Sequence, residues 1–153
     1  GVNDFFNRRV RWVEDIHSWR QKDFWATPLE MLGKGQGDCE DYSIAKYQTL
    51  RKLGIANHQL RMIYVRARVG RSGDSIAHMV LGHYATPQGE PLILDNLIST
   101  IMPASQRDDL TPVFAFNSNG LWAGETSRSL ADPTQRLSRW RSVLQRMTTE
   151  GFL

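Results

Sequence analysis

The sequence contains a single cysteine among its 153 residues. One thiol can form neither an internal disulfide nor a metal site built from several thiolates, so both are excluded within this chain. No apolar run approaches the roughly 20 residues of a membrane-spanning helix, and the chain has no repeats or low-complexity tracts. The net charge of +3 is too small for electrostatics alone to indicate nucleic acid or a membrane surface as a partner. We therefore expect no nucleic-acid partner and no direct membrane insertion.

The length predicts one domain over residues 1–153, because the chain is too short for two substantial cores. Apolar residues at helical spacing predict a first helix through residues 5–19 that Thr27-Pro28 terminates, a second from Asp38 to a stop at Gly54, and a last one over 134–147. Alternating and β-rich segments predict strands at 60–69, 77–85, 91–97, 113–116 and 121–123. Turn residues at 87–90 make the second and third strands a hairpin. The pattern is typical of an α+β fold.

Cys39 lies where a glycine-rich loop turns into the second predicted helix, in Gly35-Gln36-Gly37-Asp38-Cys39-Glu40-Asp41-Tyr42. The positive end of the helix dipole favours a thiolate in the first turn, and the thiolate is the nucleophilic form. Lone cysteines are commonly small buried hydrophobes, but acidic and glycine neighbours are a poor setting for one. The sequence therefore predicts a nucleophile. The Cys39 N–H is favoured over the Gln36 side chain as oxyanion donor.

A cysteine nucleophile needs a base and a group that orients the base, and the predicted hairpin supplies both. His78 lies near the start of one strand and Asp95 near the end of the next, so antiparallel pairing brings them together directly or diagonally. The imidazole would take the thiol proton and later protonate the leaving group, while the carboxylate fixes its tautomer. We therefore predict a Cys39, His78 and Asp95 triad.

Other residues compete for these roles. His83 shares the strand with His78 but points to the opposite face, so only one of them can face Cys39. Asn96 could orient an imidazole in place of Asp95, but it also points the other way. His17 lies on the polar flank of the first predicted helix and His58 lies in a loop, which makes both less suitable.

Three carboxylates surround the nucleophile: Asp38, Glu40 and Asp41. Acidic residues at a helix N-terminus are explained by capping and the helix dipole. Their summed charge, however, opposes thiolate formation. A bound calcium ion would resolve this conflict, because calcium accepts carboxylate oxygens from flexible loops. No EF-hand pattern is present, so capping and metal binding both stay open on the residues alone.

Three segments resemble the bacterial transglutaminase-like cysteine proteinases in their order and spacing: Gly37-Asp38-Cys39-Glu40-Asp41-Tyr42, Ala77-His78-Met79-Val80-Leu81 and Leu94-Asp95-Asn96-Leu97. The likeness continues in Trp25-Ala26-Thr27-Pro28 and Arg107-Asp108-Asp109-Leu110. It implies a papain-like, transglutaminase-like core with the nucleophile at a helix N-terminus packed on an antiparallel sheet. It also implies the triad above and dependence on Ca²⁺, for which Asp38, Glu40 and Asp41 are the candidate ligands.

The resemblance further implies a periplasmic endopeptidase that cleaves a large cell-surface adhesin near its N-terminus, at a pair of alanines. Release of the adhesin would promote biofilm dispersal, and a LapD-like inner-membrane receptor for cyclic di-GMP would sequester the enzyme. Two other classes stay open. A transglutaminase or other thiol acyltransferase could use the same triad with an amine acceptor, and a binding module could keep the fold without activity.

Other aromatic and basic residues have simpler interpretations. Trp25 and Trp122 could wall a cleft, but core packing is the more common role of such residues. The arginines of the last predicted helix, Arg136, Arg139, Arg141 and Arg146, are interpreted as a solvated face, because no base-stacking aromatic set accompanies them.

Overall fold

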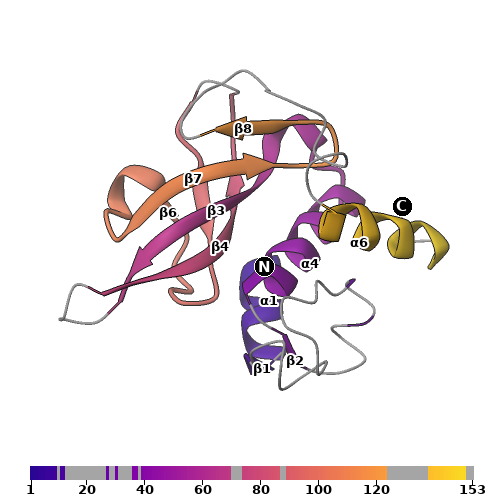
Figure 1. The fold of residues 1–153 in the computed structure, drawn as a ribbon, viewed down its shortest axis with the longest axis horizontal. Helices are drawn as coiled ribbons and strands as arrows, with labels where there is room; N and C mark the ends of the chain where they lie inside the picture. The colour runs from indigo at the N-terminus through magenta and orange to yellow at the C-terminus, as the bar shows by residue number, and fades with distance from the viewer. Residues whose placement is uncertain are drawn as a thin grey trace.

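The computed structural model describes residues 1–9, 11–12, 27, 30, 36–37, 39–69, 74–86, 89–123 and 138–150. A sheet lies on one side of the molecule and the three α-helices α1, α4 and α6 lie on the other (Figure 1). The sheet has the strand order β6-β5-β4-β3-β7-β8, and all its neighbouring strands are antiparallel. Its strands are β3 (Leu60–Arg68), β4 (Ser75–His83), β5 (Leu92–Leu94), β6 (Met102–Pro103), β7 (Leu110–Phe116) and β8 (Leu121–Ala123). The α+β prediction and the hairpin formed by β4 and β5 are confirmed.

Three α-helices accompany the sheet in the described ranges: α1 (Val2–Arg9), α4 (Cys39–Lys52) and α6 (Ser138–Thr149). Short 3-10 turns form η1 (Asn57–Gln59) and η2 (Ala104–Gln106). The predicted stop of α4 is confirmed, because Gly54 has φ of +105° and the N–H of Ile55 returns to the carbonyl of Leu50. None of these helices is long and apolar enough to cross a membrane.

The predicted first helix is wrong at residues 11–12, and its residues 13–19 lie outside the described part of the chain. α1 ends at Arg9, and Arg11–Trp12 form strand β1, which pairs in parallel with β2 (Gln36–Gly37). Pairing with a distant segment therefore outweighs the helical spacing of the aromatic residues. Because β2 precedes α4 by a single residue, this pairing also places the chain that leads into Cys39.

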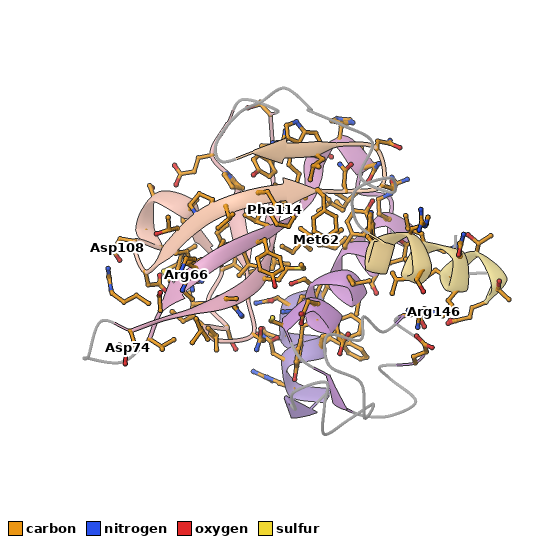
Figure 2. The ribbon with its side chains drawn as sticks, in the orientation of Figure 1. Met62, Arg66, Asp74, Asp108, Phe114 and Arg146 are labelled. Carbon is orange, nitrogen blue, oxygen red and sulfur yellow. The ribbon has the colours of Figure 1, made fainter. Side chains whose placement is uncertain are left out.

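Each face of the sheet carries a cluster of buried apolar side chains. On one face, Met62, Met79 and Leu81 pack with residues of α4 and α6, and Figure 2 shows Met62 between the sheet and the helices. On the other face, Ile63, Val65, Val80, Ile93 and Ala115 form a second cluster. The alternation that predicts the strand at 60–69 does not indicate that both of its faces are packed.

Candidate active site

The β4–β5 hairpin brings His78 and Asp95 into direct contact. Nε2 of His78 lies 2.7 Å from Oδ1 of Asp95, and both side chains are buried. Leu81 pairs with Leu94, so Asp95 directly follows the last paired residue and reaches diagonally back to His78. The diagonal geometry is one of the two that the sequence allowed.

The competing residues do not form the contact between His78 and Asp95. His83 is the last residue of β4, where it pairs with Leu60 at the far end from His78. His58 is exposed in η1, and Asn96, which follows Asp95 in the chain, is half-buried. His17 lies outside the described residues.

Asp95 is held by hydrogen-bond donors on both of its oxygens. Oδ1 accepts from His78 and from the backbone N–H of Leu97 at 3.1 Å, and Oδ2 accepts from Nη2 of Arg107 at 2.8 Å. Burial raises the pKa of Asp95, but the bonds from His78 and Arg107 outweigh it and hold this pKa below its usual value. The carboxyl group therefore stays ionised at neutral pH.

The ionised carboxylate assigns the tautomer of His78. A carboxylate only accepts hydrogen bonds, so Nε2 of His78 must carry a proton to bind Oδ1 of Asp95. In the neutral imidazole the lone pair then lies on Nδ1. Nδ1 is therefore the ring nitrogen that is able to accept a proton.

Cys39 is the first residue of α4 and is half-buried against the core that α4 shares with the sheet. One turn further along α4, Oγ of Ser43 donates to the backbone carbonyl of Met79. Met79 directly follows His78 in β4, and residues four apart lie on one side of a helix. The fold therefore fixes the N-terminal end of α4 next to the strand that carries His78.

Glu40 contacts the thiol directly. Sγ of Cys39 donates to Oε2 of Glu40 at 3.3 Å, and Glu40 is only 5 % exposed. A thiol that donates to a carboxylate keeps its proton, and a thiolate in the same place would face a negative charge. The structure thus shows the conflict between thiolate formation and the acidic neighbours that the sequence indicated.

The acidic cluster of Asp38, Glu40 and Asp41 has some of the features of a calcium site. Glu40 and Asp41 are both buried, and buried carboxylates require positive or hydrogen-bonding partners. Carboxylate oxygens are the ligands that calcium prefers. Asp38 lies outside the described residues, and within them no three acidic, histidine or cysteine side chains converge as a metal site. The predicted ligand set therefore stays a prediction.

Sequence reasoning missed three residues around Asp95. Arg107 also binds Asp109, with Nε 3.0 Å from Oδ1. Asn7 of α1 donates to the backbone carbonyl of Asp95 at 2.8 Å, and its Oδ1 accepts from Nζ of the buried Lys46 at 2.8 Å. A buried carboxylate predicts a basic partner, but the sequence cannot select it among 19 lysines and arginines.

The other residues that the sequence singled out either pack in the structure or lie outside its described residues. Trp122 packs against the cluster around Ile63 and Val65, and the centroid of its ring lies 4.0 Å from Cζ of Arg61. This packing supports the interpretation of Trp122 as a core residue. Arg141 is exposed, and Arg146 forms an ion pair with Glu30. Trp25 and Arg136 lie outside the described residues, as do the side chains of Gln36 and Arg139.

Comparisons with known proteins agree with this geometry. The family described as bacterial transglutaminase-like cysteine proteinase BTLCP matches residues 1–109. The chain is similar to an EGTA-treated structure of LapG from Legionella pneumophila, with 42 % identity and a TM-score of 0.82 over 95 % of this chain and 75 % of that one. A second structure of Legionella pneumophila LapG has 40 % identity and a TM-score of 0.80 over the same shares.

A calcium-bound structure of Legionella pneumophila LapG is similar as well. It has 42 % identity and a TM-score of 0.75, over 95 % of this chain and 76 % of that one. Among curated protein sequences, none matched the chain.

Proposed function

The chain belongs to the bacterial transglutaminase-like cysteine proteinase family, and we propose that it is a calcium-dependent endopeptidase of the periplasm with the triad Cys39, His78 and Asp95. Its substrate is a large cell-surface adhesin, which it cleaves near the N-terminus and so releases, promoting biofilm dispersal. The observation that carries the proposal is the buried contact between His78 and Asp95. His78 lies on β4, and Ser43, one turn after Cys39 in α4, donates a hydrogen bond to Met79 of the same strand.

Acylation follows from the assigned tautomer. Nδ1 of His78 takes the proton from Sγ of Cys39, and the resulting imidazolium is stabilised by the Asp95 carboxylate at Nε2. The thiolate attacks the carbonyl carbon of the scissile peptide bond and forms a tetrahedral intermediate. His78 then returns its proton to the leaving amine as the C–N bond breaks. A thioester on Cys39 remains.

Deacylation reverses the roles with water. His78 takes a proton from the water that attacks the thioester, and Cys39 leaves as a thiolate that regains its proton. The oxyanion in both steps needs donors close to Cys39. The backbone N–H of Cys39, in the first turn of α4, is the proposed donor, because such groups have no partner within the helix.

Calcium binding is proposed for Asp38, Glu40 and Asp41. When bound, calcium supplies a divalent positive charge that offsets the carboxylates beside the nucleophile. The existence of a calcium-bound structure of a protein 42 % identical to this chain supports this assignment. A weak calcium site is useful in the periplasm, because cytosolic calcium is scarce.

Substrate and regulation complete the proposal. The scissile segment must lie extended along the site, and small residues such as a pair of alanines allow its backbone to approach Cys39 closely. A LapD-like inner-membrane receptor for cyclic di-GMP would hold the enzyme inactive by covering the same site.

Product analysis tests the reaction class. An extended peptide containing the alanine pair is incubated with the protein and calcium, with and without an added primary amine, and the products are weighed by mass spectrometry. An endopeptidase gives two fragments whose masses sum to the peptide plus one water. Joining of the amine to the N-terminal fragment as the main product would instead indicate an acyltransferase.

A further inference from the structure

We propose that Arg107 is a positioning residue for the triad: it binds one oxygen of Asp95 so that the other stays directed at the ring of His78. This inference rests on the proposed function and adds to it a residue from outside the β4–β5 hairpin, in the turn between η2 and β7.

The Asp95 carboxylate is divided between two partners. Nη2 of Arg107 lies 2.8 Å from Oδ2, while Nε2 of His78 lies 2.7 Å from Oδ1. With both oxygens bound, the carboxylate cannot turn about its last side-chain bond without losing one of these contacts. The orientation of the His78 ring is thereby fixed as well.

Arg107 is itself fixed from several directions. Its Nε and Nη2 bind the two oxygens of Asp109 at 3.0 and 3.1 Å. Its backbone N–H donates to Ala104 of η2, and its carbonyl accepts from Leu110 at the start of β7. Arg107 lies between η2 and β7, and both β7 and β4 pair with β3, so the turn that carries Arg107 leads into the same sheet as His78.

Arg107 is an unfavourable residue to bury for packing alone. It is 2 % exposed, and its Nη1 is buried without a hydrogen-bond partner among the described residues. Replacing a buried ion pair by well-packed apolar side chains of similar size often leaves the stability of a protein unchanged or raises it. A need to hold Asp95 explains why a guanidinium occupies this place.

The test compares Arg107→Gln with Arg68→Gln, which removes the same charge from an exposed ion pair. Nη2 of Arg68 lies 3.9 Å from Oδ1 of Asp108, and Figure 2 shows Asp108 at the outer end of the sheet, away from the α-helices. With the peptide assay above, Arg107→Gln should lower kcat about tenfold to a hundredfold with KM nearly unchanged, because a buried side chain does not touch substrate. Arg68→Gln should leave both constants unchanged.

Two further measurements separate positioning from a merely structural role. The first is a double variant: if Arg107 acts through Asp95, adding Arg107→Gln to Asp95→Asn should cost no further activity. The second is the pH profile. Burial raises the pKa of Asp95, while the hydrogen bonds from His78 and Arg107 lower it. Loss of Arg107 should therefore raise this pKa, and the fall of kcat on the acid side of the pH profile should begin at a higher pH.

NMR of histidine-labelled protein reads the His78 tautomer without any substrate. The wild-type protein should show a proton fixed on Nε2 of His78, and Arg107→Gln should weaken or shift this signal while Arg68→Gln leaves it alone. This result would support the positioning role even if the protein did not cleave peptides. Should Arg107→Gln fail to fold, Arg107→Lys can be used instead. It keeps the positive charge but lacks the paired N–H donors of the guanidinium, and it should show the same changes to a smaller degree.

An unchanged His78 signal and an unchanged kcat in a folded Arg107 variant would overturn the positioning role while leaving the protease proposal intact. Additive losses in the double variant would overturn it as well, because Arg107 would then act independently of Asp95.

Discussion

The hydroxyl of Ser43 donates to the backbone carbonyl of Met79 at 3.1 Å, and this bond joins α4 to β4 beside His78. β5 pairs with β4 over Leu81 to His83, so α4 meets the edge of β4 where the pairing with β5 has ended. Cys39 lies one turn before Ser43 on the same side of the helix. The proposed nucleophile and base are therefore carried by two regular elements whose contact the fold determines.

The triad residues should act as one unit. Cys39→Ala and His78→Ala should each abolish turnover with the fold intact, and Asp95→Asn should lower kcat about a thousandfold or more, because an amide at this position stabilises the wrong tautomer. Rates on the alanine-pair peptide and circular dichroism measure both effects. His83→Ala serves as the matched control and should keep its activity. Loss of activity in His83→Ala but not in His78→Ala would refute the assignment of the base.

Calcium should control activity through the acidic cluster. EGTA should suppress peptide cleavage, and added calcium should restore it better than magnesium, which demands near-octahedral geometry and retains its waters. Glu40→Gln should weaken calcium binding in isothermal calorimetry, while Glu90→Gln, an exposed site, should not. If calorimetry detects no binding at millimolar calcium, the cluster has only a helix-capping role.

Lys46 should make stability rise with pH. Burial lowers the pKa of Lys46 from 10.5 to about 7, while Asp95 and Asp4 act in the opposite direction. Between these two pH values the unfolded chain holds a proton that the folded chain has released, so stability increases as the pH rises through this window, by a few kcal/mol at most. The free energy of unfolding at pH 7 and pH 9.5, from urea titrations, measures this increase.

The matched variants are Lys46→Met and Lys52→Met, of which only the first removes a buried lysine. Lys46→Met should lose the increase with pH, and Lys52→Met should keep it. Parallel pH profiles for the wild type and Lys46→Met would show that Lys46 is charged in the folded protein throughout this range.

Receptor and substrate should exclude one another. The Cys39→Ala variant would bind the adhesin segment without cutting it, so displacement of a labelled segment by the periplasmic domain of the receptor can be followed by fluorescence anisotropy. Complete displacement is expected if both partners cover the same site. A stable ternary complex with the segment still bound would disprove control by this route.

Local signals made the hairpin and α4 predictable. The turn residues at 87–90 and the glycine at position 54 define where elements end. From the sequence, Thr27-Pro28 indicates only the end of the first predicted helix. In the structure, Thr27 and Glu30 bond to each other reciprocally through backbone and side chain, which is the bond pattern of a capping box. The spacing of these two residues was a readable signal that the interpretation missed.

Long-range pairing explains the rest. Nothing local indicates that Arg11–Trp12 pair with Gln36–Gly37, or that Arg107 is the partner of Asp95. The hairpin register placed His78 next to Asp95, because a two-residue period restricts which side chains share a face. The positions of buried charged partners follow no such period in the sequence. The contacts of Arg107 and Lys46 could therefore be identified only from the structure.

The most direct measurement is cleavage of an N-terminal adhesin fragment, analysed by mass spectrometry. With calcium, the wild-type protein should produce two fragments from a single cut between adjacent alanines. EGTA and Cys39→Ala should each leave the fragment whole, and readdition of calcium should restore the cut. Cleavage that persists in Cys39→Ala, or an intact fragment with folded, calcium-loaded wild-type protein, would contradict a calcium-dependent adhesin protease that uses Cys39.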